Sequence, residues 1–425
     1  MTLRIDRRTF LLSSLALAPQ LRAQGLRLET FLQWQNASPS ERAAALPLLL
    51  DRIRAVDPKI HAWVQVLPQE PLGRGNLSGI PFAVKDVFET KGLATEYGSP
   101  VYKGRVGTTD ATIVRDLRTR GGILLGKTQT AAFAYRHPPP TRNPRNTDHT
   151  PGGSSSGSAA AVAAGMAPLA LGTQTGGSVL RPASFCGVTG FKPTHGLIPT
   201  DGVMEYAKSL DTVGFFTHTA ADMIAFWAAF GRPVGRAEDV ALGVVDPPPA
   251  VDPDMARALS AAVARLRSRG HTIRTLDIAP MLDRLRAAGM TISTYEGARA
   301  HEARFKQYGD RLDDVATLVR DGLKIADADY SKATRYVAEC RATMTDLYKG
   351  TPIILVPAAP GAAPRGLEST GDARINYPFT ALGTPAISIP MAMTNGLPLG
   401  LQLTADRGDE ARLLQTSVAV ERSLA

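Results

Sequence analysis

Residues 152–178 read GGSSSGSAAAVAAGMAPLALGTQTGGS, in which two Gly-rich segments flank a run of small and apolar residues. The alanines after the first Gly-rich segment (152–158) predict a helix over 158–165 with almost no side-chain bulk, so neighbouring backbone can approach it closely. The apolar residues 168–172 predict a short buried strand that runs into the second Gly-rich segment (172–178). Because the first N–H groups of a helix have no partner within it, we expect the loop before this helix to be electropositive and rich in free donors.

Outward from this stretch, strand and helix patterns alternate along the chain. This alternation favours an α/β fold, and Asn395-Gly396 between two apolar runs predicts a hairpin that makes the sheet mixed. With no internal repeat and no obvious linker, the sequence predicts one large domain, residues 24–425, with a central mixed, twisted β-sheet flanked by α-helices on both sides. Strands are expected at 80–84, 123–125, 168–172, 241–245, 271–278, 353–356, 386–389 and 399–403, and helices after a capping box at Ser38 and at 110–120, 158–165, 253–269, 281–348 and 408–424.

The N-terminal segment has the pattern of an export signal. Arg7-Arg8 precede Thr9-Phe10-Leu11, an apolar run shorter than a membrane span follows, and small residues come after it. This order is typical of a signal peptide, and the paired arginines resemble the twin-arginine type. The alternative is an amphipathic first helix, but the run is apolar on all faces. We therefore predict a twin-arginine-type signal peptide over residues 1–23, cleaved after Ala23, and a periplasmic or secreted protein.

Composition and charge exclude several classes of protein. The formal net charge is +9, but residues 1–23 hold four arginines and one aspartate, so the mature chain would carry +6. Basic and aromatic residues do not interleave as in single-strand binders, and we expect no nucleic-acid partner. No apolar run of about 18–20 residues follows the signal, so we expect no stable membrane insertion after cleavage. Two cysteines cannot supply a disulfide framework or a Cys-based zinc site, and the sequence predicts no metal and no cofactor.

The first Gly-rich segment also matches other patterns formally. Gly153-Ser154-Ser155-Ser156-Gly157 fits the GxSxG of α/β-hydrolases, but that elbow needs a strand directly before the serine, and residues 146–151 read as loop. The phosphate-loop pattern GxxxxGK(S/T) is missing. A flexible linker would not lead straight into a strongly helical alanine run. We therefore reject these three interpretations.

Several motifs together resemble those of the amidase signature family. They occur in order across nearly the whole mature chain, and the resemblance is weakest between about 245 and 350. It implies an α/β domain of the amidase-signature type. Besides the two Gly-rich segments, the motifs are Gly79-Ile80-Pro81-Phe82-Ala83-Val84-Lys85-Asp86, Pro182-Ala183-Ser184-Phe185-Cys186-Gly187, Lys192-Pro193-Thr194, Ser209-Leu210-Asp211-Thr212-Val213-Gly214, Gly383-Thr384-Pro385-Ala386-Ile387-Ser388-Ile389-Pro390 and Gly396-Leu397-Pro398-Leu399-Gly400-Leu401-Gln402-Leu403.

The resemblance implies a Ser–Ser–Lys triad. Ser178 matches the nucleophile and Lys85 the buried base. Ser154 matches the bridging serine, which follows a cis peptide bond and relays the proton. The chemistry is coherent, because a serine hydroxyl is a weak nucleophile that needs a base. A lysine can serve as that base only when burial keeps it neutral.

The same resemblance places an oxyanion hole in the second Gly-rich segment. Its donors would be the backbone N–H groups of Thr175, Gly176, Gly177 and Ser178. Glycine at these positions lets a carbonyl oxygen come close to the backbone. Donors held in this way stabilise the charge that develops on the oxygen in the transition state.

Other residues near the motifs are expected to be structural. Ser155 and Ser156 would cap the following helix, and Ser155 is also expected to support the triad. Lys127 would be a competing lysine with a structural role, and Asp211 a turn or backbone-bonding residue rather than a catalyst. His149 and His195 are expected to be scaffold residues that form hydrogen bonds. Nothing in the sequence pairs the two cysteines, Cys186 and Cys340.

Two positions depart from the commonest pattern of the family. Residue 174 is Gln where Asp is usual, and residue 180 is Leu where Arg is usual, with Arg181 one place later. If the usual residues form an ion pair near the nucleophile, both partners are replaced here, which is less damaging than leaving one buried charge alone. The sequence leaves open how Gln174 and Leu180 affect the loop.

The sequence thus predicts an exported amidase that hydrolyses a carboxamide C–N bond of a small molecule through an acyl-enzyme on Ser178. One alternative is an amidotransferase-like subunit that uses an amine supplied by a partner. The export signal argues against it, because charged tRNA substrates are cytoplasmic. The other alternative is a non-catalytic exported solute-binding protein. The sequence leaves open which amide is the substrate and whether the chain forms a homodimer.

Overall fold

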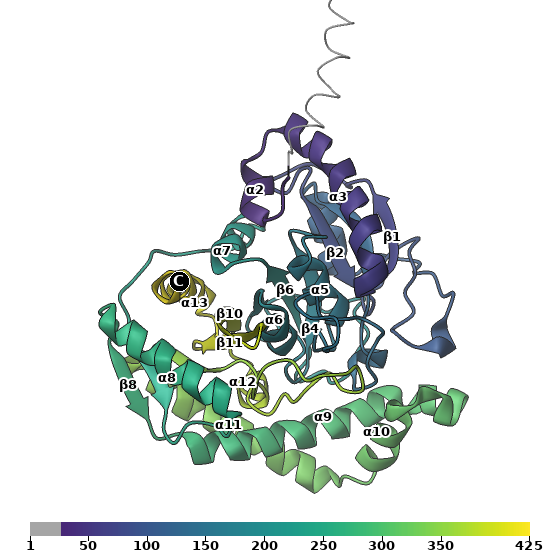
Figure 1. The fold of residues 1–425 in the computed structure, drawn as a ribbon. Coiled ribbons are helices and arrows are strands. Elements are labelled where there is room, and N and C mark those ends of the chain that lie inside the picture. The colour runs from purple at the N-terminus through teal and green to yellow at the C-terminus, as the bar shows by residue number, and fades with distance from the viewer. Residues whose placement is uncertain (1–26) are drawn as a thin grey trace, which may run out of the picture.

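The computed structural model describes residues 27–425, and eleven strands among them form one sheet (Figure 1). The signal peptide expected over residues 1–23 lies outside the described residues and stays a prediction. The strand order is β1-β3-β2-β4-β6-β5-β10-β11-β9-β7-β8. The strands are β1 (Trp63–Gln69), β2 (Pro81–Lys85), β3 (Ile123–Thr128), β4 (Ala170–Gln174), β5 (Thr189–Lys192), β6 (Thr212–Thr217), β7 (Leu242–Val245), β8 (Ile273–Leu276), β9 (Ile353–Pro357), β10 (Ala386–Thr394) and β11 (Leu397–Thr404).

The sheet is mixed, as predicted. β2 runs parallel to β3 and β4, and β7 runs parallel to β8 and β9, whereas the ladders between β4 and β11 are antiparallel. The expected hairpin joins β10 to β11, and Asn395 and Gly396 have φ of 48° and 77°, the positive values that such a turn requires. The sequence prediction missed β1, β5 and β6. β1 contains a proline, β5 has four residues, and β6 carries a glycine, so none has a clear strand pattern.

Helices flank the sheet, as predicted. α5 and α6 contact each other and lie against the central strands, and α7, α8 and α13 pack on other strands of the sheet. Figure 1 shows α9, α10 and α11 as a layer at the end of the molecule away from α2 and α3. The helices are α2 (Phe31–Asn36), α3 (Pro39–Ile60), α4 (Thr112–Thr119), α5 (Ser156–Ala163), α6 (Leu180–Cys186), α7 (Ala220–Ala229), α8 (Pro253–Ser268), α9 (Ala279–Tyr308), α10 (Asp314–Gly322), α11 (Asp327–Gly350), α12 (Tyr377–Leu382) and α13 (Glu410–Leu424).

Local sequence explains where several helices begin and end. α3 starts at the predicted capping box, in which Ser38 and Glu41 exchange hydrogen bonds. The helical sequence expected over 281–348 is divided into three helices, and α9 ends at Gly309, where φ is 55°. No helix within residues 27–425 combines the length and the apolar character needed to cross a membrane.

The small residues of α5 allow the close packing that the sequence predicted. A Cβ atom at Gly157 would collide with the backbone of Ala62 and Gln129. Residues 156–162 of the helix are buried, and the helix contacts β2, β3, β4 and β6. This packing holds the first Gly-rich segment against the C-terminal ends of β2 and β4, where the candidate site lies.

Candidate active site

Lys85 is fully buried at the C-terminal end of β2, in the middle of the sheet. Its Nζ donates hydrogen bonds of 2.8 Å to Ser154 Oγ and 2.8 Å to Thr173 Oγ1. Burial lowers the pKa of Lys85 from 10.5 to about 7, and the charge of Asp211 partly opposes this shift. A substantial fraction of the amine is therefore neutral near pH 7, the state in which it can accept a proton.

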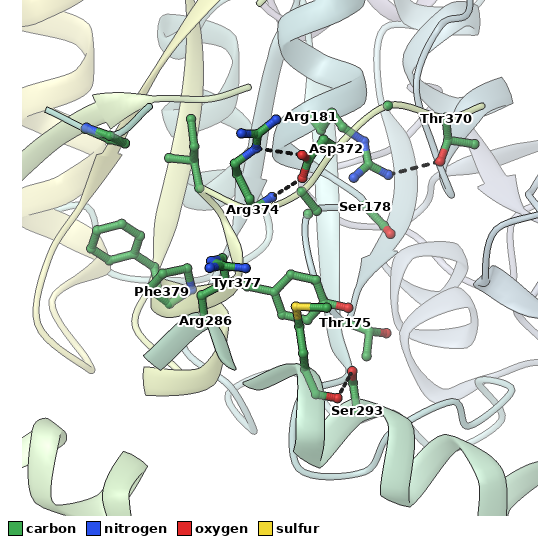
Figure 2. A pocket seen from close by; sticks show the side chains of 18 of the residues that line it. Thr175, Ser178, Arg181, Arg286, Ser293, Thr370, Asp372, Arg374, Tyr377 and Phe379 are labelled. Atoms are coloured by element: carbon green, nitrogen blue, oxygen red, sulfur yellow. Dashed lines mark hydrogen bonds and ion pairs between the residues drawn. The ribbon is translucent and has the colours of Figure 1, made fainter. Parts of the chain in front are cut away.

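Ser154 and Ser178 lie on adjoining loops beside Lys85. The peptide bond between Gly153 and Ser154 is cis. Ser178 follows β4 in the second Gly-rich segment and lines a pocket (Figure 2). The two loops are linked by a hydrogen bond of 3.4 Å from Ser155 N to Ser178 O. The structure thus puts Lys85 in direct contact with Ser154 and brings Ser178 to the next loop, at the pocket wall.

The two serines after Ser154 do not cap α5 as expected. Ser155 occupies the N-cap position but its hydroxyl makes no capping bond; it donates to Thr173 O at 3.2 Å and accepts from Thr173 N at 3.3 Å. Ser156 Oγ donates to Gly152 O at 2.6 Å. The capping prediction is wrong because both hydroxyls instead bond to backbone groups of β4 and of the loop itself. Ser155 instead ties the first Gly-rich segment to β4.

The second Gly-rich segment offers free backbone donors. Within residues 27–425, the N–H groups of Thr175, Gly176, Gly177 and Ser178 donate no hydrogen bond. The short helix α12, which the sequence prediction missed, packs against this segment: a Cβ at Gly176 would lie 2.8 Å from the Tyr377 ring. Glycine is therefore needed here to make room for α12, and the N–H groups remain free to bind an oxygen atom.

Gln174 organises this segment through its neutral side chain. Its Oε1 accepts hydrogen bonds from Val179 N at 2.9 Å and Leu180 N at 3.1 Å, and its Nε2 donates to Thr380 Oγ1 at 3.0 Å. Thr380 Oγ1 also donates to Gly176 O at 2.7 Å. Leu180 is buried as an apolar residue. The two departures from the usual pattern thus leave no unpaired charge, because an amide holds the loop where an ion pair would otherwise be expected.

Arg181 is the buried cation next to the candidate nucleophile. Its side chain is 5% exposed and lines the pocket. Nη2 donates to Gly153 O at 2.6 Å and Thr370 Oγ1 at 3.2 Å, whereas Nε is buried without a partner. No carboxylate within residues 27–425 pairs with it, since Asp372 pairs with Arg374. Burial lowers the pKa of Arg181 to about 10, so the guanidinium remains charged at neutral pH.

The pocket has a volume of about 1240 Å³ and extends from Ser178 to the layer formed by α9 (Figure 2). The region with the weakest resemblance to the family, 245–350, contributes one wall through residues 247–250 and side chains of α9, including Arg286 and Met290. The loop before α12 contributes the opposite part of the lining, including Asp372 and Arg374. The pocket therefore carries charges of both signs away from Ser178.

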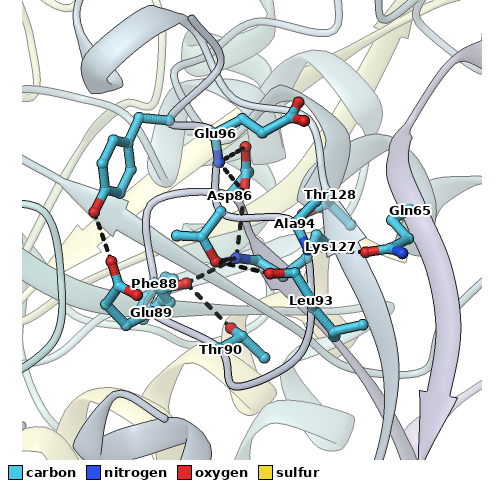
Figure 3. Close-up of polar contacts among 12 residues, drawn as sticks. Gln65, Asp86, Phe88, Glu89, Thr90, Leu93, Ala94, Glu96, Lys127 and Thr128 are labelled. Carbon is cyan, nitrogen blue, oxygen red and sulfur yellow. Dashed lines mark hydrogen bonds and ion pairs between the residues drawn. The ribbon is translucent and has the colours of Figure 1, made fainter. Parts of the chain in front are cut away.

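Lys127 is held away from the serines. Its Nζ lies 3.2 Å from Asp86 Oδ1 and donates to Phe88 O at 2.7 Å and Thr95 Oγ1 at 3.0 Å (Figure 3). Both charged side chains are fully buried. These contacts fix the loop that follows Lys85, which agrees with the structural role expected from the sequence.

The remaining residues singled out by sequence have scaffold contacts. His149 Nδ1 lies 2.7 Å from Ala363 O, and His195 Nε2 lies 3.1 Å from Lys208 O. Cys186 and Cys340 are both buried and free. In the described part of the chain, no three His, Cys, Asp or Glu residues are grouped so that they could hold a metal ion. None of these four residues forms a hydrogen bond with Ser154 or Lys85.

Comparisons with known proteins agree with this architecture. A glutamyl-tRNA(Gln) amidotransferase subunit from Synechococcus sp. (strain WH7803) is 32% identical, over 92% of this chain and 96% of the relative. The protein of the same name from Thermus thermophilus is also 32% identical, over 96% and 97%.

Solved structures extend the similarity. One described as an amidase has a TM-score of 0.81 at 26% identity and covers 90% of this chain and 96% of that one. A 6-aminohexanoate cyclic dimer hydrolase has a TM-score of 0.81 at 25% identity and covers 94% and 98%. A family model described as Amidase matches residues 44–414. The chain therefore belongs to the amidase signature family.

Proposed function

We propose that this protein is an amidase that hydrolyses a carboxamide C–N bond through an acyl-enzyme on Ser178. The observation that carries the proposal is the contact between the buried Lys85 amine and Ser154 Oγ, beside the loop of Ser178. Membership of an enzyme family argues against the solute-binding alternative. The contact between a buried amine and a serine argues against it too, because a solute-binding protein would need no such base.

The proposed reaction uses these residues in order. Ser178 Oγ attacks the carbonyl carbon; its proton passes to Ser154 Oγ while the Ser154 proton passes to Lys85 Nζ. The carbonyl electron pair moves to oxygen, which the free N–H groups of the second Gly-rich segment would stabilise. The C–N bond then breaks, and the leaving amine takes the proton back along the same path. Water, deprotonated through the same chain, hydrolyses the ester and releases the acid.

The amidase proposal predicts a rise in activity with pH. Lys85 accepts a proton only when neutral, so the active fraction is small below its pKa of about 7 and complete above it. We expect kcat/KM to increase about tenfold per pH unit below pH 6 and to level off above pH 8. A pH profile on any turned-over amide measures this directly. A profile that is flat from pH 5.5 to 9, or that falls with pH, would contradict Lys85 as the base.

Arg181 narrows the class of substrate in this proposal. A buried cation with an unpartnered Nε and no carboxylate partner is costly, and a bound anion would offset that cost. Arg181 follows Ser178 by three residues, lies in the first turn of α6 and lines the same pocket. We therefore propose that the scissile amide belongs to a molecule that carries a carboxylate or similar anionic group near the amide.

An Arg181→Gln variant tests this class of substrate. We expect KM for a carboxylate-bearing amide to rise about 100-fold, because a buried charge-assisted contact is lost. The matched control is the methyl ester of the same amide, on which the variant should lose less than about threefold. Equal losses on both compounds would mean that Arg181 acts only by holding Gly153 and Thr370.

The relatives found by sequence favour a second candidate, an amidotransferase-like subunit that depends on a partner, because they are named as amidotransferase subunits. The signal peptide predicted for residues 1–23 argues against a tRNA-dependent role and therefore for the hydrolase.

An ammonia-release screen with the isolated chain separates the two candidates. The substrates would be short aliphatic, aryl and amino-acid amides, with and without a carboxylate. Ammonia release by the chain alone supports the hydrolase. Inactivity on every amide, with release only in the presence of a partner protein, would favour the amidotransferase.

A further inference from the structure

Asp211 directly precedes β6 and lies beside residues 175–178, the part of the second Gly-rich segment that carries the proposed oxyanion donors and is called the oxyanion segment below. The reaction proposed above assigns no role to Asp211. In the antiparallel ladder of β4 and β6, Thr173 is paired with Val213 and Gln174 with Thr212. The next residues on the two chains, Thr175 and Asp211, therefore lie opposite each other. Thr175 Oγ1 donates a hydrogen bond of 2.5 Å to Asp211 Oδ1. Because Lys85 Nζ bonds to Thr173 on the same strand, Asp211 stands near both the base and the oxyanion donors.

The Asp211 carboxylate is held rigidly on its own loop. Its Oδ2 accepts hydrogen bonds from Tyr206 N at 2.7 Å and Ala207 N at 3.0 Å. The same loop is tied to α9 because Ser209 N and Oγ both donate to the Glu296 carboxylate. Three donors therefore fix both oxygens of Asp211, and its charge has a defined place relative to β4.

We propose that Asp211 is a positioning residue that anchors the oxyanion segment through Thr175 and stabilises the Lys85 ammonium that forms during acylation. This inference rests on the proposed amidase function. The proton that leaves Ser178 arrives at Lys85 Nζ and creates a buried positive charge. A fixed carboxylate nearby lowers the free energy of that state without accepting a proton itself.

The electrostatics of the surroundings agree with this role. The Asp211 charge raises the pKa of Lys85 against the larger effect of burial. Burial raises the pKa of Asp211 itself to about 6, opposed by the hydrogen bonds from Thr175, Tyr206 and Ala207, so the carboxylate is ionised where Lys85 works. The titratable groups on the elements around it are Lys85 from β2, Glu205 and Tyr206 from its own loop, Tyr135, Glu296 from α9 and Tyr377 from α12.

The test measures the rate at which a fluorophosphonate labels Ser178 between pH 5 and 9. Labelling forms the Oγ–P bond, releases fluoride and sends the serine proton to Lys85, so it needs no knowledge of the substrate. For Asp211→Asn we expect the pH midpoint to move about 1 unit to the acid side, because the ammonium loses its counter-charge. We expect the plateau at high pH to fall about tenfold. Glu205→Gln, the loss of an exposed carboxylate from the same loop, is the matched control and should leave the midpoint unchanged.

The results of this test distinguish a failure of the role proposed for Asp211 from a failure of the amidase proposal. A lower plateau with an unchanged midpoint in Asp211→Asn would overturn it, because a purely structural role predicts that result. If that variant does not fold, Thr175→Val replaces it: without the hydroxyl, Asp211 becomes neutral at higher pH, and the midpoint should again move to the acid side. An unchanged midpoint there also overturns the inference. Failure of the amidase proposal would look different, since wild type would not be labelled at all.

Discussion

Replacement of Ser178 by alanine is expected to lower kcat on any turned-over amide by about 10⁵-fold and to abolish fluorophosphonate labelling. We expect no neighbouring serine to replace the proposed nucleophile. Ser154 is 1% exposed, its hydroxyl accepts a hydrogen bond from Lys85, and it does not line the pocket. Ser155 and Ser156 are also buried and bonded to backbone. Ammonia release and gel-based labelling measure the two effects.

The matched control for this prediction is Ser184→Ala. Ser184 lies on α6, a few residues after Ser178, and its hydroxyl is buried without a partner. Removing this hydroxyl leaves no other polar group without a hydrogen-bond partner. Activity should therefore stay within about twofold of wild type, and the free energy of unfolding within about 0.5 kcal/mol. Persistent labelling of Ser178→Ala would move the nucleophile to another residue and refute the proposed acyl-enzyme.

Replacement of Lys85 by methionine is expected to lower kcat/KM by about 10⁴-fold and to remove the rise of activity with pH. Methionine keeps most of the apolar volume but cannot accept the proton from Ser154. Lys192→Met is the matched control, because Lys192 is also fully buried with a pKa lowered to about 7. Its amine donates to Pro193 O and Thr384 O and to neither Ser154 nor Ser178. Because methionine leaves these two buried carbonyls without their donor, the control should lose stability while the folded fraction keeps its activity.

Lys85→Met should also melt at an equal or higher temperature than wild type. The unfolded chain keeps a proton on Lys85 below pH 10.5, whereas the folded chain releases it down to about pH 7. This difference destabilises the fold increasingly as pH falls from 10.5 to 7, and methionine removes the cost. Near wild-type activity in a well-folded Lys85→Met would show that another group is the base.

The Gly-rich segments of the candidate site could be recognised from local sequence patterns. The Gly-rich segments need small residues wherever backbone or α12 approaches closely, so their sequence is visible without any structure. The hairpin at Asn395-Gly396 and the capping box at Ser38 are equally local. The capping prediction for Ser155 and Ser156 failed because their actual partners belong to β4 and to the loop.

Long-range contacts that no motif of the family implies could not be predicted. Gln174 bonds to Thr380, 206 residues away, and this contact explains how the loop tolerates the loss of the usual acidic residue. The role inferred for Asp211 depends on the register between β4 and β6, which no pattern in either strand specifies. Such contacts depend on which strands become neighbours in the sheet, and that choice is made by the packing of the whole domain.

The sequence by itself determined the α/β class, the two Gly-rich segments and the lysine and serines that resemble those of the family, because each depends on residue type and local spacing. Only the tertiary structure showed the different surroundings of the three fully buried lysines. Lys127 lies beside Asp86, Lys192 donates to backbone carbonyls, and Lys85 alone of the three donates to Ser154. The proton affinity of a buried amine is set by the charges and dipoles around it. Those neighbours come from strands and loops that are distant in sequence and meet only in the folded domain.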